Sequence, residues 1–270
     1  MPSMPKFAAN LSMMFNEVPF LERFAAAKSA GFAGVEFLFP YEFSPNELAH
    51  HLHGNGLQQV LFNLAPGDWE AGERGLAALP GREDEFRASV DQALEYAGVL
   101  SCKTLHVMAG VVPSDTPWEK MFDTVVENLG FAADAFAQAG VTAVLEPLNS
   151  RDAPGYFLPR AADAARVIKA VDRPNVGLQF DFYHVQIMDG DLARHFEAHA
   201  EITRHVQIAG VPERHEPDVG EINFPYLFEL MDRLGYDGWV GCEYRPRTTT
   251  MEGLGWLSDF SSEDKEGKPR

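Results

Sequence analysis

Residues 141–146 read VTAVLE and residues 176–181 read VGLQFD, and in both a short, largely apolar run ends on a carboxylate. Similar β-prone runs recur along the chain, at residues 7–11, 34–39, 57–63, 104–108, 205–209 and 239–244. Between them lie segments in which apolar residues return every three or four positions, as in Phe122, Val126 and Leu129, which is the spacing of amphipathic helices. Eight strands with interposed helices predict an α/β fold, a (β/α)8 TIM barrel.

The length of the chain fits one such barrel. The sequence has 270 residues, and this fold commonly takes about 250 residues as a single unit. Helix boundaries agree, because Ser44 supplies an N-cap and Pro45 a first turn, while no proline- or serine-rich linker divides the chain. We expect residues 1–260 to form the barrel and the polar residues 261–270 to be a disordered C-terminal tail.

The composition argues against several classes of protein. Forty acidic side chains oppose 22 basic ones, and the formal charge of -18 would repel both nucleic acid and an anionic membrane. Two cysteines are too few for a disulfide framework and lack the paired spacing of a zinc–thiolate site. The first residues, up to Val18, do not form a secretory signal, and no segment approaches membrane-spanning length. We therefore expect a cytoplasmic protein without nucleic-acid or membrane partners.

Polar side chains end four of the later strands, one strand–helix unit apart. They are Glu146, Asp181, Gln207 and Glu243. Because the carboxyl ends of all barrel strands meet at one face, these side chains should converge there. Three converging carboxylates repel one another unless a cation lies between them, and oxygen ligands favour Mg2+ or Mn2+. Taken singly, each carboxylate could instead cap a helix or pair with Arg245 or Arg247, but that reading does not suit the whole set.

Several short strings then give the sequence a specific resemblance, which extends to about residue 257. They are residues 9–13 (ANLSM), 34–37 (GVEF), 67–69 (GDW), 71–75 (AGERG), 79–83 (LPGRE), 146–149 (EPLN), 181–184 (DFYH), 220–223 (GEIN) and 241–244 (GCEY). In this order they resemble the hydroxypyruvate isomerase family, within the xylose-isomerase-like TIM barrel superfamily.

The resemblance implies that Glu146, Asp181, Gln207 and Glu243 hold the metal, and that Glu146 and Glu243 also act as the proton donor and acceptor. Sugar epimerases of the superfamily carry a histidine at the third metal position, whereas this chain has Gln207. The difference favours the isomerase branch. The expected enzyme is an intramolecular oxidoreductase of carbohydrate and glyoxylate metabolism.

The expected reaction interconverts hydroxypyruvate and 2-hydroxy-3-oxopropanoate (tartronate semialdehyde). Such a shift of a carbonyl removes a proton from one carbon and returns one to its neighbour, through an enediolate that a cation stabilises. The alternatives are a 2-oxo-tetronate isomerase or a ketose 3-epimerase using the same chemistry. A metal-dependent phosphodiester hydrolase is more remote, because it needs further histidine ligands and a basic groove.

Four further residues are candidate contacts of the small hydroxy-oxo acid substrate. His184 and Arg214 are the nearest cationic or hydrogen-bonding anchors for its carboxylate, with helix capping or packing as the alternative for His184. Strand parity turns His106 and Glu36 into the barrel, where each is either a substrate contact or a structurally paired core residue.

The glycine-rich and charged segment at residues 66–82 follows the third strand, and we expect it to cover the mouth of the site. Its Glu70, Glu73 and Arg74 are interpreted as solvated surface charges without a catalytic role. Homo-oligomerisation is compatible with a barrel of this kind, but no apolar stripe identifies an interface in the sequence.

Overall fold

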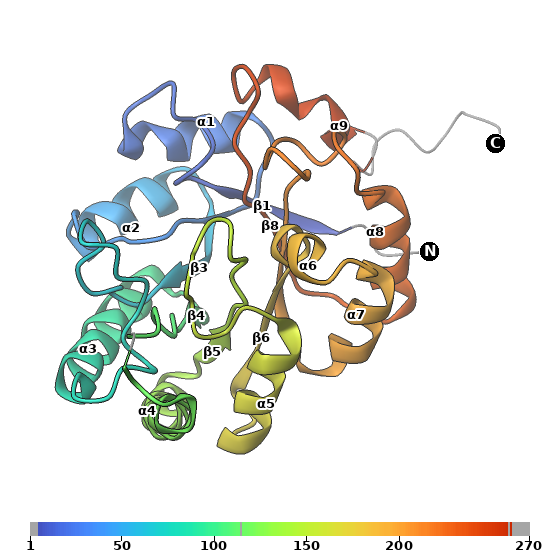
Figure 1. Cartoon of the computed structure of the whole chain (residues 1–270). Coiled ribbons are helices and arrows are strands. Elements are labelled where there is room, and N and C mark those ends of the chain that lie inside the picture. Colours follow the sequence, from blue (N-terminus) through green and yellow to red (C-terminus); the bar gives the residue numbers. More distant parts are fainter. Residues whose placement is uncertain (1–4, 114, 259, 261–270) are drawn as a thin grey trace.

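The computed structural model describes residues 5–113, 115–258 and 260, and its eight parallel strands close into a barrel in chain order (Figure 1). The strands are β1 (Lys6–Asn10), β2 (Gly34–Glu36), β3 (Gln58–Asn63), β4 (Thr104–His106), β5 (Thr142–Leu145), β6 (Val176–Asp181), β7 (Thr203–Ile208) and β8 (Trp239–Cys242). Closure comes from pairing of β1 with β8, in which Lys6 lies opposite Trp239. The predicted (β/α)8 TIM barrel is confirmed.

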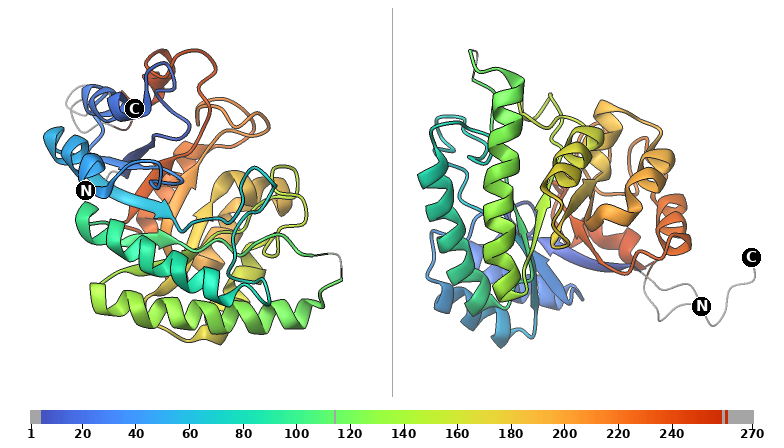
Figure 2. Two further views of the ribbon diagram at one scale, coloured as in Figure 1. Left: turned by 90° about the vertical axis from the view of Figure 1, so that its left-hand side faces the viewer. Right: turned by 90° about the horizontal axis from the view of Figure 1, so that it is seen from below.

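Helices surround the strands and form the outer layer (Figures 1 and 2). They are α1 (Arg23–Ser29), α2 (Pro45–Gly54), α3 (Glu83–Leu100), α4 (Trp118–Ala139), α5 (Ala161–Val171), α6 (Phe182–Met188), α7 (Leu192–His199), α8 (Phe224–Arg233) and α9 (Gly255–Ser258), with the short 3-10 turns η1 (Phe20–Glu22), η2 (Ala200–Ile202) and η3 (Glu252–Leu254). The predicted start of α2 is confirmed, since the Glu47 amide donates to Ser44 Oγ at 3.2 Å. Within the described residues, no helix is long and apolar enough to cross a membrane.

Five strands, β2, β3, β4, β5 and β8, are shorter than the runs that predicted them. β2 ends at Glu36 and β4 ends at His106, although the apolar runs continue. Beyond β2 the Leu38 amide donates to Ser12 Oγ at 2.9 Å, while the Leu38 carbonyl still accepts from the Asn63 amide of β3 at 2.8 Å. The predicted tail, residues 261–270, lies outside the described residues.

The interior of the barrel is apolar at one end and polar at the other. Ala8, Val60, Leu61 and Val144 form a small buried cluster against Trp239, the first residue of β8. A larger cluster fills the space between strands and helices. Buried polar side chains such as Glu36 and Gln179 lie farther along their strands, toward the carboxyl ends. The fold thus supports a polar site at one end on an apolar base.

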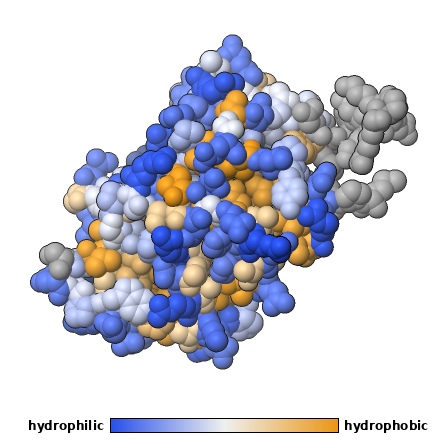
Figure 3. Space-filling view, turned by 45° about the vertical axis from the view of Figure 1, so that its right-hand side comes forward, coloured by the Kyte–Doolittle hydropathy of each residue, from blue (hydrophilic) through white to orange (hydrophobic). Residues whose placement is uncertain are grey.

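The face of the molecule seen in Figure 3 is largely hydrophilic, with apolar patches among polar side chains. The large apolar side chains exposed among the described residues are Val112, Trp118, Phe131, Tyr226, Leu234 and Met251. They are spread over several elements, so they do not by themselves define an interface.

Candidate active site

Three of the four predicted strand-end residues meet at the carboxyl end of the barrel. Glu146 follows β5, Asp181 ends β6 and Glu243 follows β8. Together with His184 of α6 they form a buried group in which one ligand atom from each residue lies within 4.8 Å of the others. The parallel arrangement of the strands explains this convergence, because each carboxylate leaves its strand at the same rim.

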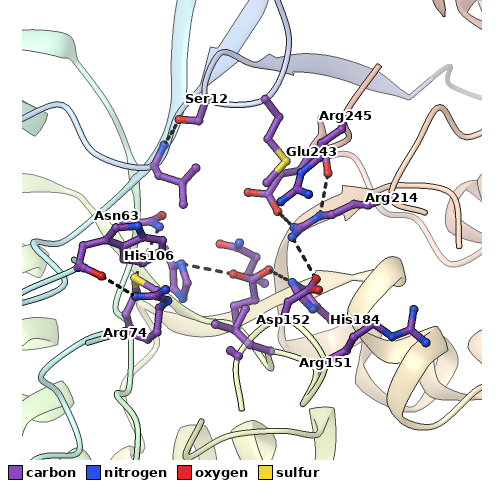
Figure 4. Close-up of a pocket in the computed structure, with 18 of the residues that line it drawn as sticks. Ser12, Asn63, Arg74, His106, Arg151, Asp152, His184, Arg214, Glu243 and Arg245 are labelled. Atoms are coloured by element: carbon purple, nitrogen blue, oxygen red, sulfur yellow. Dashed lines mark hydrogen bonds and ion pairs between the residues drawn. The ribbon is translucent and has the colours of Figure 1, made fainter. Parts of the chain in front are cut away.

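A cavity of about 620 Å³ opens above this group. Loops after several strands line it, and Figure 4 shows many of these side chains. The lining residues are Ser12, Met13, Asn16, Leu38, Asn63, Trp69, Arg74, His106, Met108, Glu146, Leu148, Arg151, Asp152, Ala153, Gln179, His184, Arg214, Glu243 and Arg245. Both Trp69 and Arg74 belong to the segment at residues 66–82, so this segment does border the mouth as predicted. The cavity is large enough for a small polar acid.

The buried carboxylates fit a divalent cation. Glu146 Oε1 and Asp181 Oδ2 are shielded from solvent and have no hydrogen-bond partner among the described residues. An unpaired buried carboxylate oxygen is costly, and a hard cation satisfies several such oxygens at once. Arg214 supplies only part of the compensating charge: its Nη2 contacts Glu243 Oε2 but remains 3.7 Å from Asp181 Oδ2.

The same crowding shifts the protonation of the carboxyl groups. Burial raises the pKa of Glu146, and the negative charges of Glu243 and Asp181 raise this pKa further. Burial also raises the pKa of Asp181 to about 6 and the pKa of Glu243 to about 8, although the Arg214 guanidinium opposes both shifts. Carboxyl groups with a pKa near neutrality can accept and return protons near neutral pH, as general acid–base catalysis requires.

His184 presents a ring N–H toward this group. The backbone N–H of Asn149 donates to His184 Nδ1 at 3.1 Å, so Nδ1 has no proton. Burial lowers the pKa of His184 well below its ordinary value, and the neutral ring therefore carries its proton on Nε2. That Nε2 lies 3.5 Å from Asp181 Oδ2 and 3.7 Å from Glu146 Oε1. A protonated Nε2 cannot ligate a metal, so His184 is suited to hydrogen-bond the acids or a ligand.

Gln207 is buried, and its side-chain amide is held by two neighbouring polar side chains. Its Nε2 donates to Glu36 Oε1 at 2.8 Å, which fixes the amide orientation and leaves Oε1 on the other side. There Oε1 accepts a hydrogen bond from Gln179 Nε2 at 2.6 Å. Glu36 thus orients the Gln207 amide so that its Oε1 is the atom available to the site. In this structure Oε1 is hydrogen-bonded to Gln179, which lines the cavity.

For Glu36 the sequence left two roles open, a substrate contact and a structurally paired core residue. Parity placed it correctly inside the barrel, but it is fully buried and does not line the cavity. Its carboxylate accepts from Asn10 Nδ2 at 3.0 Å and from Gln207, and it contacts His205 Nε2 at 2.7 Å. These contacts place Glu36 within a buried polar network, which fits the paired core residue that the sequence also allowed.

The other predicted contacts do line the cavity. His106 Nδ1 is 3.5 Å from Glu146 Oε2, and burial lowers the pKa of His106 to about 3, so the ring is neutral. Arg214 lies over the ring of Tyr183, with its guanidinium carbon 4.7 Å from the ring centroid, and its Nη1 is 3.5 Å from Asp152 Oδ2. Its charge is already engaged by acids.

Sequence reasoning missed Asn10, Gln179 and Asn149. Asn10 links two carboxylates, because its Nδ2 donates to Glu36 Oε1 and to Glu243 Oε1 at 3.1 Å. Gln179 has the strand parity of Asp181, and a polar residue at an inward position of a buried strand is the signal that could have identified it.

Comparisons with known proteins agree on one family. The sequence model described as "Xylose isomerase-like TIM barrel" matches residues 24–260. The chain is 60% identical to a 2-oxo-tetronate isomerase of Cupriavidus necator over 95% of this chain and 99% of the relative. It is 44% identical to the hydroxypyruvate isomerase of Escherichia coli, over 95% of this chain and all (100%) of the relative.

Solved structures give the same fold. A protein from Brucella melitensis described as "AP endonuclease, family 2" superposes with a TM-score of 0.93 at 55% identity, over 95% of this chain and 99% of that one. A 3-keto-D-glucoside 4-epimerase from E. coli has a TM-score of 0.79 at 23% identity, over 95% of this chain and 100% of that one. At that identity the second likeness concerns the fold alone.

Proposed function

Because the chain belongs to the xylose isomerase-like TIM barrel family, and its relatives make it an isomerase, we propose that it is a metal-dependent isomerase of small 2-oxo acids. The observation that carries the proposal is a pair of buried oxygens, Glu146 Oε1 and Asp181 Oδ2, which have no hydrogen-bond partner in the described part of the chain and lie beside Glu243 at a cavity. Residues 1–260 would form the catalytic domain.

Two substrates are candidates, and they share the reacting atoms. In hydroxypyruvate and in 2-oxo-tetronate alike, the carboxylate is C1, the carbonyl is C2 and the hydroxyl is on C3. They differ in one hydroxymethyl group on C3. Relatives named 2-oxo-tetronate isomerase are 48–60% identical to this chain, against 44–45% for those named hydroxypyruvate isomerase. We place 2-oxo-tetronate first for this reason, with the sequence-based expectation of hydroxypyruvate second.

The proposed reaction needs one carboxylate as a base and one carboxyl group as an acid. One carboxylate removes the proton from C3, and electrons move to give an enediolate over C2 and C3. The other carboxyl group donates a proton to C2, while the proton of the C3 hydroxyl passes to the C2 oxygen, so that C3 becomes the carbonyl and C2 carries the hydroxyl. Glu146 and Glu243 are the proposed pair, since burial raises the pKa of each. The neutral His184 would donate from Nε2 to a substrate oxygen.

The same residues would hold the metal. Glu146, Asp181 and Glu243 offer carboxylate oxygens, and Gln207 Oε1 would complete the set in place of its bond to Gln179. Mg2+ or Mn2+ suits such ligands. When bound, the ion would supply positive charge that stabilises the enediolate.

Steady-state isomerisation assays test the proposal. The metal-stripped protein would be assayed with 2-oxo-tetronate, hydroxypyruvate and a neutral ketose, before and after addition of Mg2+ or Mn2+. We expect metal-dependent turnover of at least one 2-oxo acid, with a higher kcat/KM than for the ketose. Turnover of the ketose alone would favour a 3-epimerase, and turnover of none would reject the proposal. Cleavage of abasic DNA would support the hydrolase alternative.

A further inference from the structure

The segment that borders the mouth, residues 66–82, is held firmly against the barrel. The Gly75 amide donates to the Pro66 carbonyl at 2.8 Å, and the Ala78 amide donates to the Ala109 carbonyl at 2.7 Å. Asn128 of α4 donates from Nδ2 to the Ala77 carbonyl at 2.9 Å. Ala77 and Ala78 are fully buried. The segment therefore forms a fixed wall of the cavity.

One guanidinium is presented on this wall. Arg74 stacks on Trp69, with its guanidinium carbon 3.7 Å from the ring centroid. Its Nη1 donates to the carbonyls of Trp69 at 3.1 Å and Glu73 at 2.7 Å. Stacking and two backbone acceptors fix the plane of the guanidinium before any ligand arrives, which reduces the entropy lost on binding.

The charge of Arg74 has no acid partner among the described residues. None of their carboxylate oxygens lies within 4.0 Å of its guanidinium nitrogens, and Nε and Nη2 make no hydrogen bond to them. The neighbouring Glu73 is bound to Arg82 instead, at 2.8 Å. Arg214, in contrast, contacts Glu243 and lies near Asp152. Arg74 is thus a preorganised cation with free donors at the cavity.

The cavity consequently has two poles. Figure 4 draws Arg74 beside Asn63 and His106, on the other side of the cavity from Arg214 and Glu243. A substrate carboxylate would be repelled by the acid group and attracted by the unpaired guanidinium. The carbonyl and hydroxyl oxygens of the same molecule would then face the acids.

We propose that Arg74, held by Trp69, binds the C1 carboxylate of the substrate and so selects 2-oxo acids over neutral ketoses. This inference rests on the proposed function, and it deepens it by assigning the carboxylate to a residue outside the acid group. It also revises the sequence-based expectation that Arg74 is a solvated surface charge and that Arg214 or His184 is the anchor. Both candidate acids carry the same C1 carboxylate, so the assignment holds for either.

The test compares Arg74→Gln and Arg74→Lys with a matched control, Arg166→Gln. Arg166 also stacks on a tryptophan, 4.7 Å from the Trp118 ring centroid, but neither residue lines the cavity. The first readout is KM for the acid that the wild type turns over. The second is the Kd of D-glycerate, an unreactive acid with the same carboxylate, measured by calorimetry on the metal-loaded protein. Thermal unfolding checks that each variant is folded.

We expect Arg74→Gln to raise both KM and Kd by about 10- to 100-fold, the effect of losing charge-assisted hydrogen bonds to a carboxylate. Arg74→Lys should recover part of the affinity, since it restores the charge without the planar fork. Arg166→Gln should change neither constant by more than about twofold. A merely structural role would lower stability or kcat without this selective loss of acid binding.

The outcomes separate the two claims. If the wild type isomerises no acid, the proposed function fails, while glycerate binding that Arg74→Gln weakens would still support the anchor. If the wild type is active but Arg74→Gln leaves KM and glycerate binding within twofold of wild type, the anchor is rejected and the proposed function stands. Absence of glycerate binding by the wild type at millimolar concentration would also overturn the anchor.

Discussion

Substitution of Glu36 by glutamine should weaken both the fold and the metal site. Glu36 is fully buried, and its carboxylate is contacted by Asn10, Gln207 and His205 at 2.7–3.0 Å. Asn10 in turn donates to Glu243, and the Gln207 amide is oriented by Glu36. The substitution keeps the size of the side chain while removing its charge and replacing one acceptor oxygen with a donor.

The magnitude follows from these contacts. A hydrogen bond to a charged group contributes about 1.5–3 kcal/mol, against about 1 kcal/mol for a neutral one, so three contacts lose about 3 kcal/mol. Relief from burying a carboxylate returns about 1 kcal/mol of this. The net loss of about 2 kcal/mol corresponds to a fall in Tm of about 4–8 °C for a chain of this size. Misplacing Gln207 should also weaken metal binding by about tenfold.

Thermal unfolding and metal titration of Glu36→Gln would measure these effects. Glu221→Gln is the control, because the Glu221 carboxylate accepts a solvent-exposed bond from Gln186 at 3.1 Å. The control should keep its Tm within about 1 °C and its metal affinity unchanged. If Glu36→Gln behaved like the control in both assays, the buried network would not support the site and the reasoning would be refuted.

Three further predictions concern the wall, the acids and the thiols. Gly75→Ala should lower the free energy of unfolding by about 1–3 kcal/mol in chemical denaturation, because the added Cβ would lie 2.2 Å from the Met108 carbonyl oxygen. The control Gly72→Ala should lose less stability, because a Cβ at Gly72 meets nothing within 4 Å, and equal losses would contradict this reasoning. Metal affinity should rise with pH between about 6 and 8, because carboxyl groups with raised pKa values must lose their protons before they can bind the metal. Calorimetry in two buffers would detect the protons released on metal binding, and an affinity that does not change with pH would contradict this prediction. Cys102 and Cys242 are both buried, and burial raises the pKa of Cys102 to about 12. The native protein should therefore resist thiol reagents that label both cysteines after denaturation, and fast labelling of the native protein would contradict this prediction.

Much of the barrel was predictable because its signals are local. Short β-prone runs alternate with helical spacing, and the carboxyl ends of parallel strands meet at one rim whatever the loops do. Those two facts suffice to bring Glu146, Asp181 and Glu243 together, and the structure does so. Strand ends were harder to predict, since beyond β2 the Leu38 amide donates to a side chain, Ser12, while the Leu38 carbonyl still accepts from Asn63 of β3.

The depth of a residue in the barrel was not predictable. Parity gave the inward direction of Glu36 correctly, but whether an inward residue reaches the cavity depends on the stagger between strands. The register of β1 with β2, in which Asn10 lies opposite Glu36, decides the buried network. A single sequence does not contain that register.

The position of Arg74 at the cavity was not predictable for a related reason. A charged residue in a glycine-rich loop is usually solvated, and its position depends on backbone angles such as the φ of +83° at Gly67 and of +116° at Gly75. Those angles fold the segment onto Ala109 and turn Arg74 to the cavity. The loop conformation, and not the composition, creates the candidate anchor.

The central claim is that two buried glutamates move a proton between adjacent carbons of a 2-oxo acid when a divalent metal is bound. Proton NMR in deuterated water observes this step directly, with metal-stripped protein, 2-oxo-tetronate or hydroxypyruvate, and Mg2+ or Mn2+ added second. The account predicts metal-dependent deuterium incorporation and formation of the isomeric acid. It also predicts that Glu146→Gln and Glu243→Gln each lose about 100-fold or more of the isomerisation rate. Isomerisation that proceeds without metal, or that survives both substitutions, would contradict it.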